Sequence, residues 1–215
     1  NAVADIPRAT IAAISGFGIG SLLTPAFAVA VGTKTAIAAV SIPHFVGTAV
    51  RFWRMREHVD RRLLWRFGLP SAGGGLAGAL LNAQATSPEL AIVFGLLLVG
   101  AGLSQLTGGS SRWRITGPLG SVAGIVSGFF GGLVGNQGGI RAAAMLGFGV
   151  TRDRFVGTAT AVALLVDLVR LPVYLATEGT AVALIWPLVA MTTVGAVVGT
   201  LAGGAMLRRI PEPLF

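Results

Sequence analysis

Residues 127–139 read SGFFGGLVGNQGG, in the middle of an apolar run that extends from Gly117 to Val150. The run is too long for one straight membrane-spanning helix, which needs about 20 residues. Its centre is rich in glycine, which destabilises helices. The sequence therefore predicts a broken helix here, with two helical pieces around an unwound centre. The glycines concerned are Gly131, Gly132, Gly135, Gly138 and Gly139.

The composition indicates an integral membrane protein. Of the 215 residues, 53% are hydrophobic and only 11% are charged, and the mean hydropathy is +0.80. A soluble domain carries roughly 25% charged residues. The chain has too few polar side chains to cover a surface in water, so lipid must cover most of it.

Several kinds of site are excluded or disfavoured. The chain has no cysteine, so it forms neither a disulfide nor a thiolate metal site. Its two histidines and eight carboxylates are scattered, and we predict no metal site and no cofactor. The net charge of +8 does not form a basic stripe with interleaved aromatic residues, so no nucleic-acid partner is expected.

The apolar runs predict an all-α fold, a polytopic bundle of about seven transmembrane helices. The predicted spans are Ala9–Val31, Thr35–Trp53, Leu63–Leu81, Pro88–Leu106, Gly117–Val150, Phe155–Ala176 and Thr180–Leu207. The region of Pro25 in the first span is a second place where a helix is expected to break.

Arginine dominates one connection between spans, which indicates a cytoplasmic loop. Its members are Arg51, Arg54, Arg56, Arg61, Arg62 and Arg66. If every span crosses fully, the opposite side holds Lys34, Arg152, Arg154, Arg208 and Arg209. We therefore predict a multi-pass protein of the inner (cytoplasmic) membrane with a cytoplasmic N-terminus. A re-entrant hairpin at a glycine-rich segment would invert the later spans.

The chain contains an internal repeat. Aligning Gly16 with Gly135 also aligns Gly20 with Gly139 and Arg51 with Arg170. With two more residues in the loop, further pairs match: Trp65 with Trp186, Gly74 with Gly195, and Gly78 with Gly199. We predict two repeats, residues 1–107 and 108–215, in parallel orientation. The second lacks a fourth span, so the complete protein is expected to have eight. The spacing of each glycine pair, Gly74 with Gly78 and Gly195 with Gly199, is typical of close helix packing.

Two glycine-rich stretches at matching places carry a family resemblance. The first is GFGIGSLLTP (16–25) and the second is SGFFGGLVGNQGG, and each precedes a helix that starts with small residues, at 38–41 and 157–160. The pattern resembles the TauE/SafE family of sulfite-exporter-like permeases. Ile19 and the pair Asn136-Gln137 depart from the family's glycines. The resemblance implies movement of small sulfur-containing anions such as sulfite, sulfonates or thiosulfate.

An unwound helix exposes backbone N–H groups at the positive end of the next helical piece, where an anion binds favourably. Arg141 lies just beyond the second break, and an arginine binds oxyanions through two parallel hydrogen bonds. A charge in a span costs at least about 2.5 kcal/mol; the alternative is that Arg141 extends to the membrane surface. The predicted substrate-binding residues are Gly18, Gly20, Ser21, Asn136, Gln137, Gly138, Gly139 and Arg141.

Other polar residues in the spans are candidates for coupling or gating. Asp167 and Arg170 are three residues apart on one helix face and are expected to pair. Arg51 is the counterpart of Arg170, and His44 either couples protons to transport or is a hydrogen-bonded packing residue. The hydroxyl groups of Ser41, Thr158 and Thr160 either meet a substrate or bond to their own helix backbone.

The duplicated helix break and the intramembrane arginine favour a permease working by alternating access, with ion coupling. An anion channel and a non-transporting membrane assembly subunit are the alternatives. An enzyme is not expected, because no nucleophile with an adjacent base and no metal spacing is found. The expected partners are a small anion and membrane lipids, and a homo-oligomer remains open.

Overall fold

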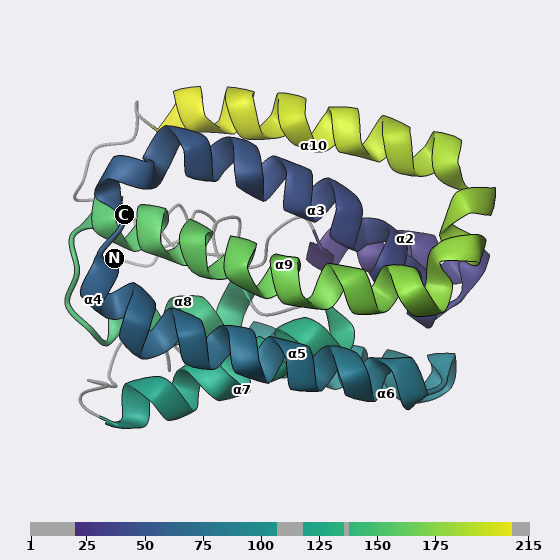
Figure 1. The fold of residues 1–215 in the computed structure, drawn as a ribbon, viewed down its shortest axis with the longest axis horizontal. Coiled ribbons are helices and arrows are strands. Elements are labelled where there is room, and N and C mark those ends of the chain that lie inside the picture. The colour runs from purple at the N-terminus through teal and green to yellow at the C-terminus, as the bar shows by residue number, and fades with distance from the viewer. Residues whose placement is uncertain (1–19, 107–117, 136–137, 208–215) are drawn as a thin grey trace.

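The computed structural model describes residues 20–106, 118–135 and 138–207, and every regular element in these ranges is a helix (Figure 1). The predicted all-α fold is confirmed. The elements are α2 (Gly20–Val31), α3 (Thr33–Met55), η1 (Arg56–His58), α4 (Arg61–Leu63), η2 (Leu64–Gly68), α5 (Leu69–Gln84), α6 (Ser87–Leu106), α7 (Pro118–Val134), α8 (Gly138–Leu146), α9 (Arg152–Leu184) and α10 (Trp186–Leu207).

Three described helices are long and apolar enough to cross a membrane: Thr33–His58, Arg152–Leu184 and Trp186–Gly203. Large apolar side chains point outward along the bundle, among them Leu96 (68% exposed) on α6 and Met191 (73% exposed) on α10. Such a surface is expected where lipid replaces water. With the apolar helices, it supports a membrane helical bundle.

Helices α3 and α9 lie side by side and run antiparallel (Figure 1). Polar contacts mark this direction along their length: Thr35 Oγ1 donates to Glu178 Oε2 at 2.7 Å, His44 Nδ1 lies 2.7 Å from Asp167 Oδ2, and the Asp60 N–H donates to Thr158 Oγ1 at 2.8 Å. The sequence repeat aligns α3 with α9, so the expected parallel orientation of the two copies is wrong for this pair. An antiparallel pair is what an inverted repeat produces.

The two ends of the bundle differ in charge. At the end where α3 finishes and α9 begins, which we call the arginine end, Arg154 Nη1 lies 4.0 Å from Asp60 Oδ2. Arg152 and Arg154 therefore share this end with the arginine-rich loop, contrary to the sequence-based assignment. At the opposite end, which we call the lysine end, Lys34 Nζ donates to the Ala83 carbonyl oxygen at 2.8 Å.

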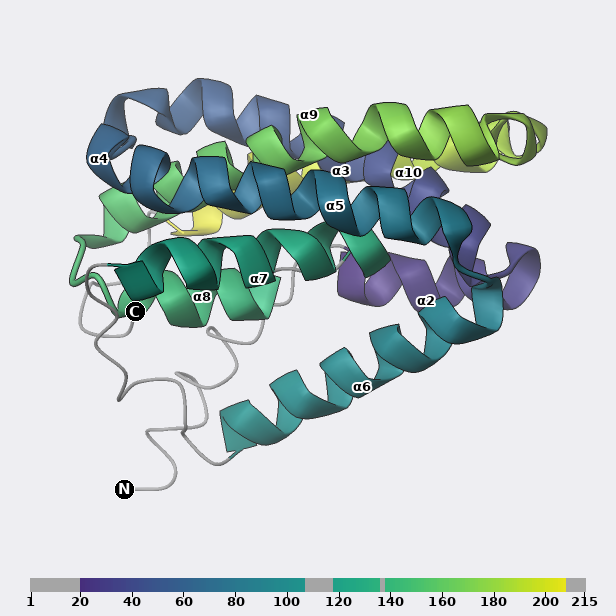
Figure 2. The same cartoon turned by 60° about the horizontal axis from the view of Figure 1, so that its bottom comes forward.

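Helices α7 and α8 form a hairpin and do not continue each other. They lie side by side in Figure 2, and a Cβ built on Gly120, near the start of α7, would contact the Phe148 ring just after α8. The chain thus enters the bundle from the arginine end and returns to it. The predicted break in the fifth span is confirmed, but that span is re-entrant. In the first repeat, Pro25 lies inside the continuous helix α2, so a break at Pro25 is wrong.

Glycine brings α5 and α7 into backbone contact. A Cβ on Gly74 would collide with the Ile125 carbonyl oxygen and one on Gly78 with that of Phe129. Across the interface, glycines of α7 face the backbone of η2 and α5 in the same way: Gly124 meets Phe67 of η2, while Gly128 meets Ser71 and Gly132 meets Gly75 of α5. The predicted packing role of Gly74 and Gly78 is confirmed. Gly195 and Gly199 instead have nothing within 4 Å of a built Cβ.

Candidate functional site

The break between α7 and α8 begins at Gly135, whose φ is 76°. Glycine adopts this left-handed conformation without steric cost. The Gly135 N–H donates to the Gly131 carbonyl oxygen at 3.0 Å, and the chain then leaves the helix. The last carbonyl groups of α7 therefore need hydrogen-bond donors from outside the helix.

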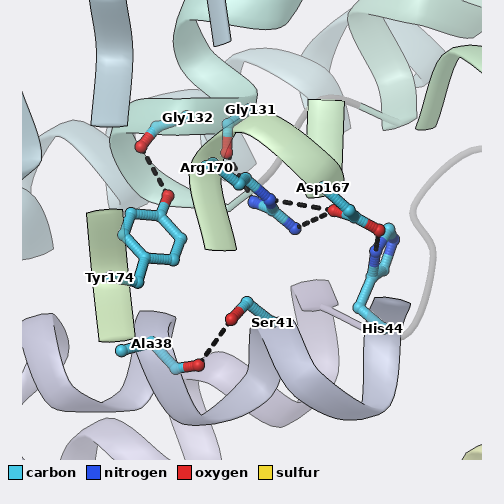
Figure 3. A network of polar contacts seen from close by, with 8 residues as sticks. All are labelled: Ala38, Ser41, His44, Gly131, Gly132, Asp167, Arg170 and Tyr174. Atoms are coloured by element: carbon cyan, nitrogen blue, oxygen red, sulfur yellow. Dashed lines mark hydrogen bonds and ion pairs between the residues drawn. The ribbon is translucent and has the colours of Figure 1, made fainter. Parts of the chain in front are cut away.

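Side chains from α9 and α5 supply these donors. The contacts are Arg170 Nη1 to Gly131 O at 2.6 Å, the Tyr174 hydroxyl to Gly132 O, and Asn82 Nδ2 to Leu133 O at 2.8 Å. Figure 3 shows the Arg170 and Tyr174 contacts. A cation at a helix C-terminus also meets the negative end of the helix dipole. The broken end of α7 is thus held in place by three buried side chains.

Asp167 joins Arg170 to His44 in a buried ionic cluster (Figure 3). Its Oδ1 accepts from Arg170 Nε at 2.9 Å and forms an ion pair with Nη2 at 2.7 Å, and its Oδ2 lies 2.7 Å from His44 Nδ1. The side chain of Asp167 is fully buried, whereas that of His44 is 19% exposed. Because an ionised carboxylate only accepts hydrogen bonds, His44 Nδ1 carries the proton of this contact.

Arg141 lies in the first turn of α8, just beyond the break, and is half-buried. Its Nη1 atom is buried and has no hydrogen-bond partner among the residues that the structure describes. The charges that act on it are those of Asp167, Arg51 and Arg170. Arg170 pairs with Asp167, so the charged groups that act on Arg141 include more positive than negative charge.

The start of α2 lies against the same break. A Cβ on Gly20 would approach the Gly135 carbonyl oxygen to 3.3 Å, and both Gly20 and Ser21 are buried. Arg170 also approaches the break, because its Nη1 lies 3.5 Å from a Cβ built on Gly135. Gly20, the last glycine of the first glycine-rich segment, therefore lies beside Gly135 of the second.

Comparison with protein families finds a match to the model described as sulfite exporter TauE/SafE, over residues 9–215. The chain belongs to the TauE/SafE family. No curated protein and no solved structure matches it. The family's description names a sulfite exporter, a membrane transporter. Family membership and the apolar helices together identify a multi-pass membrane transporter.

For this TauE/SafE protein, the structure brings part of the sequence-predicted site together. Gly20 and Ser21 lie at the start of α2, and Gly138, Gly139 and Arg141 lie in the first turn of α8. Gly18, Asn136 and Gln137 lie outside the described residues. Arg51 is exposed, near the C-terminal end of α3.

The expected pairing of Asp167 with Arg170 is confirmed. Of the three hydroxyl groups, Ser41 donates to Ala38 O at 2.6 Å and Thr160 to Val156 O at 2.7 Å, so both bond to their own helix. Thr158 Oγ1 on α9 accepts from the backbone N–H of Asp60, which lies just before α4. The interpretation of these hydroxyls as backbone partners holds for Ser41 and Thr160, while Thr158 joins α9 to the arginine-rich loop.

Sequence reasoning missed Tyr174 and Asn82. Tyr174 is the only tyrosine of the chain, and it follows Arg170 by four residues, so the two side chains share one face of α9. That spacing could have identified it. Asn82 is an isolated amide in an apolar span, and only the position of the α7 terminus reveals its partner.

Proposed function

We propose that this TauE/SafE protein is a permease for small sulfur-containing anions of the sulfite, sulfonate or thiosulfate type. It works by ion-coupled alternating access, and its substrate site lies where the start of α2 meets the α7–α8 break. The observation that carries the proposal is Arg141. Its guanidinium is half-buried beside the break, with one buried nitrogen that no described residue satisfies.

The charges around Arg141 support an anion as the missing partner. Asp167 already accepts from both Arg170 and His44, so it has little capacity left to balance Arg141. A buried charge without a partner is costly in a membrane. A bound sulfur oxyanion would balance the charge and would accept two parallel hydrogen bonds from the guanidinium.

The glycines at the two helix starts add the second part of the proposed site. Gly138 and Gly139 lie in the first turn of α8, so backbone N–H groups of this helix N-terminus are near the break, and Gly20 of α2 lies against the break. The positive dipole end of α8 favours an anion. The unpredicted closeness of Gly20 to Gly135 O supports assigning both segments to one site. We include Gly18, Asn136 and Gln137 in it on the sequence pattern alone.

Polar contacts at both ends of α3 provide candidate gates. At the lysine end, Lys34 N–H donates to Ser87 Oγ at 3.2 Å and Thr35 bonds to Glu178. At the arginine end, Asp60 bonds to Thr158. Alternating access would open one set of contacts while the other stays closed, with His44, Asp167, Arg170 and Arg51 between the two ends.

The uneven charge of the bundle supports its orientation. Arginines from the loop after α3 and from the start of α9 share one end, so we assign the arginine end to the cytoplasm and the protein to the inner membrane. The predicted cytoplasmic N-terminus lies outside the described residues and stays a prediction.

Flux into proteoliposomes tests the proposal against an anion channel. Purified protein is reconstituted, and uptake of sulfite, thiosulfate and methanesulfonate is measured as a function of external concentration, with protein-free vesicles as the control. A permease gives saturable uptake and exchange of internal for external anion. Conductance that rises linearly with concentration would support a channel, and the lack of any flux would contradict the assignment to sulfur anions.

A further inference from the structure

We propose that the coupling ion is the proton and that the His44–Asp167 pair binds it, so that one proton and one anion are transported together. This inference rests on the proposed anion permease and adds the identity and sign of its coupling. It starts from the geometry of the buried pair and from the charges that surround it.

The hydrogen bond to Asp167 leaves one nitrogen of His44 available. With Nδ1 committed to Asp167 Oδ2 at 2.7 Å, Nε2 is the acceptor of the neutral ring. The described residues offer Nε2 no hydrogen-bond donor, and the side chain is partly accessible. A proton can therefore bind at Nε2 without breaking the bond to Asp167.

The ionisable groups that bear on His44 lie on several elements of the bundle. Asp167 on α9 contacts His44 directly and pairs with Arg170. Arg141 on α8 lies within the influence of Asp167, Arg170 and Arg51, the last of which is on α3. Of the other elements packed on α3, α2 and α10 contain no ionisable side chain. Helix α6 contributes Glu89 at the lysine end, and η1 contributes Arg56, Glu57 and His58 at the arginine end. Histidine alone in this group has an unperturbed titration range near neutral pH.

The sign of the coupling follows from these charges. Arg170 and Asp167 pair with each other, whereas Arg141 has a buried nitrogen that no described residue satisfies. An anion bound at Arg141 would place a negative charge near the His44–Asp167 pair and would favour a proton on Nε2. The proton in turn strengthens anion binding by the same factor. Anion and proton therefore bind together and leave together.

Titration calorimetry with thiosulfate tests this directly. Thiosulfate remains a dianion between about pH 6 and pH 8, so any pH dependence in the range where histidine titrates belongs to the protein. Protons taken up on binding are counted by repeating the titration in two buffers of different ionisation enthalpy. The proteins compared are the wild type, His44→Gln, and His58→Gln, which alters the exposed histidine at the arginine end as a matched control.

For the wild type and His58→Gln we expect proton uptake on binding, and an affinity that rises as the pH falls by at most about tenfold per pH unit. His44→Gln should bind thiosulfate with no proton uptake and no pH dependence. Binding by the wild type without proton uptake would overturn this inference and leave the permease intact, even if His44→Gln does not fold. Absence of thiosulfate binding at every pH would overturn both.

Discussion

Arg170 on α9 donates to the carbonyl oxygen of Gly131 at 2.6 Å, so one buried cation both caps the broken end of α7 and neutralises Asp167. The contact joins the α7–α8 hairpin to α9, the longest helix among the described residues. A movement of α9 that displaces Arg170 would remove this donor from the α7 terminus, while Asn82 on α5 would still donate to Leu133 O. Arg170 therefore has a structural role distinct from the anion-binding role proposed for Arg141.

Replacement of Arg170 by methionine should destabilise the protein strongly. It leaves Asp167 buried without its cation and Gly131 without a donor, and breaking a buried pair in this way costs about 3–5 kcal/mol. Thermal unfolding in detergent measures the effect. The double variant Asp167→Asn/Arg170→Met should lose less stability than the sum of the single variants. Strictly additive losses would show that the two side chains do not act as a pair.

The glycine contacts between α5 and α7 give a second prediction. Gly78→Ala should lower the unfolding temperature, because its Cβ would collide with the rigid backbone of Phe129, and overpacking typically costs about 1–3 kcal/mol. Gly73→Ala is the matched control, since Gly73 lies in the same helix with nothing within 4 Å. We expect it to unfold at or slightly above the wild-type temperature. Equal effects of the two substitutions would contradict the close approach of these helices.

The re-entrant hairpin predicts the sidedness of labelling. The chain has no cysteine, so single cysteines can be introduced without removing others. Leu119→Cys and Thr151→Cys, at the start of α7 and just before α9, should react with a membrane-impermeant reagent from the same side as Arg62→Cys. Gln84→Cys, at the lysine end, should react from the opposite side. Reaction of Leu119→Cys and Thr151→Cys from opposite sides would mean that α7 and α8 cross the membrane.

Hydropathy along the sequence predicted where the helices begin and end, but it did not predict in which direction each helix runs through the bundle. Span boundaries such as 35–53 and 88–106 agree with α3 and α6 within about two residues, because apolar length reports directly on a helix in lipid. The orientation of α9 was wrong, because it depends on whether the segment after Gly135 crosses or returns. A segment that crosses and a segment that returns have the same hydropathy. The contact that distinguishes them, between Phe148 and Gly120, joins residues that are distant in the sequence.

The candidate site shows the same division. The spacing of Asp167 and Arg170 on one helix predicted their pairing, because neighbours on a helix face are set by local geometry. Two other contacts join different helices: Gly20 lies beside Gly135, and Arg170 donates to Gly131 O. The spacing of residues along the sequence does not predict contacts of this kind. Arg141 could be identified as an unusual intramembrane charge from the sequence, but its unpaired nitrogen emerges only when the other helices are placed around it.

Thiosulfate flux into proteoliposomes that contain the Arg141→Ala variant tests most directly whether the anion binds at the α7–α8 break. Arg62→Ala, which removes an exposed arginine of the loop, is the matched control. The described residues make no hydrogen bond to Arg141, so thermal stability should remain near that of the wild type. We predict loss of saturable flux in Arg141→Ala and wild-type flux in Arg62→Ala. Wild-type saturable flux in a folded Arg141→Ala protein would contradict the account.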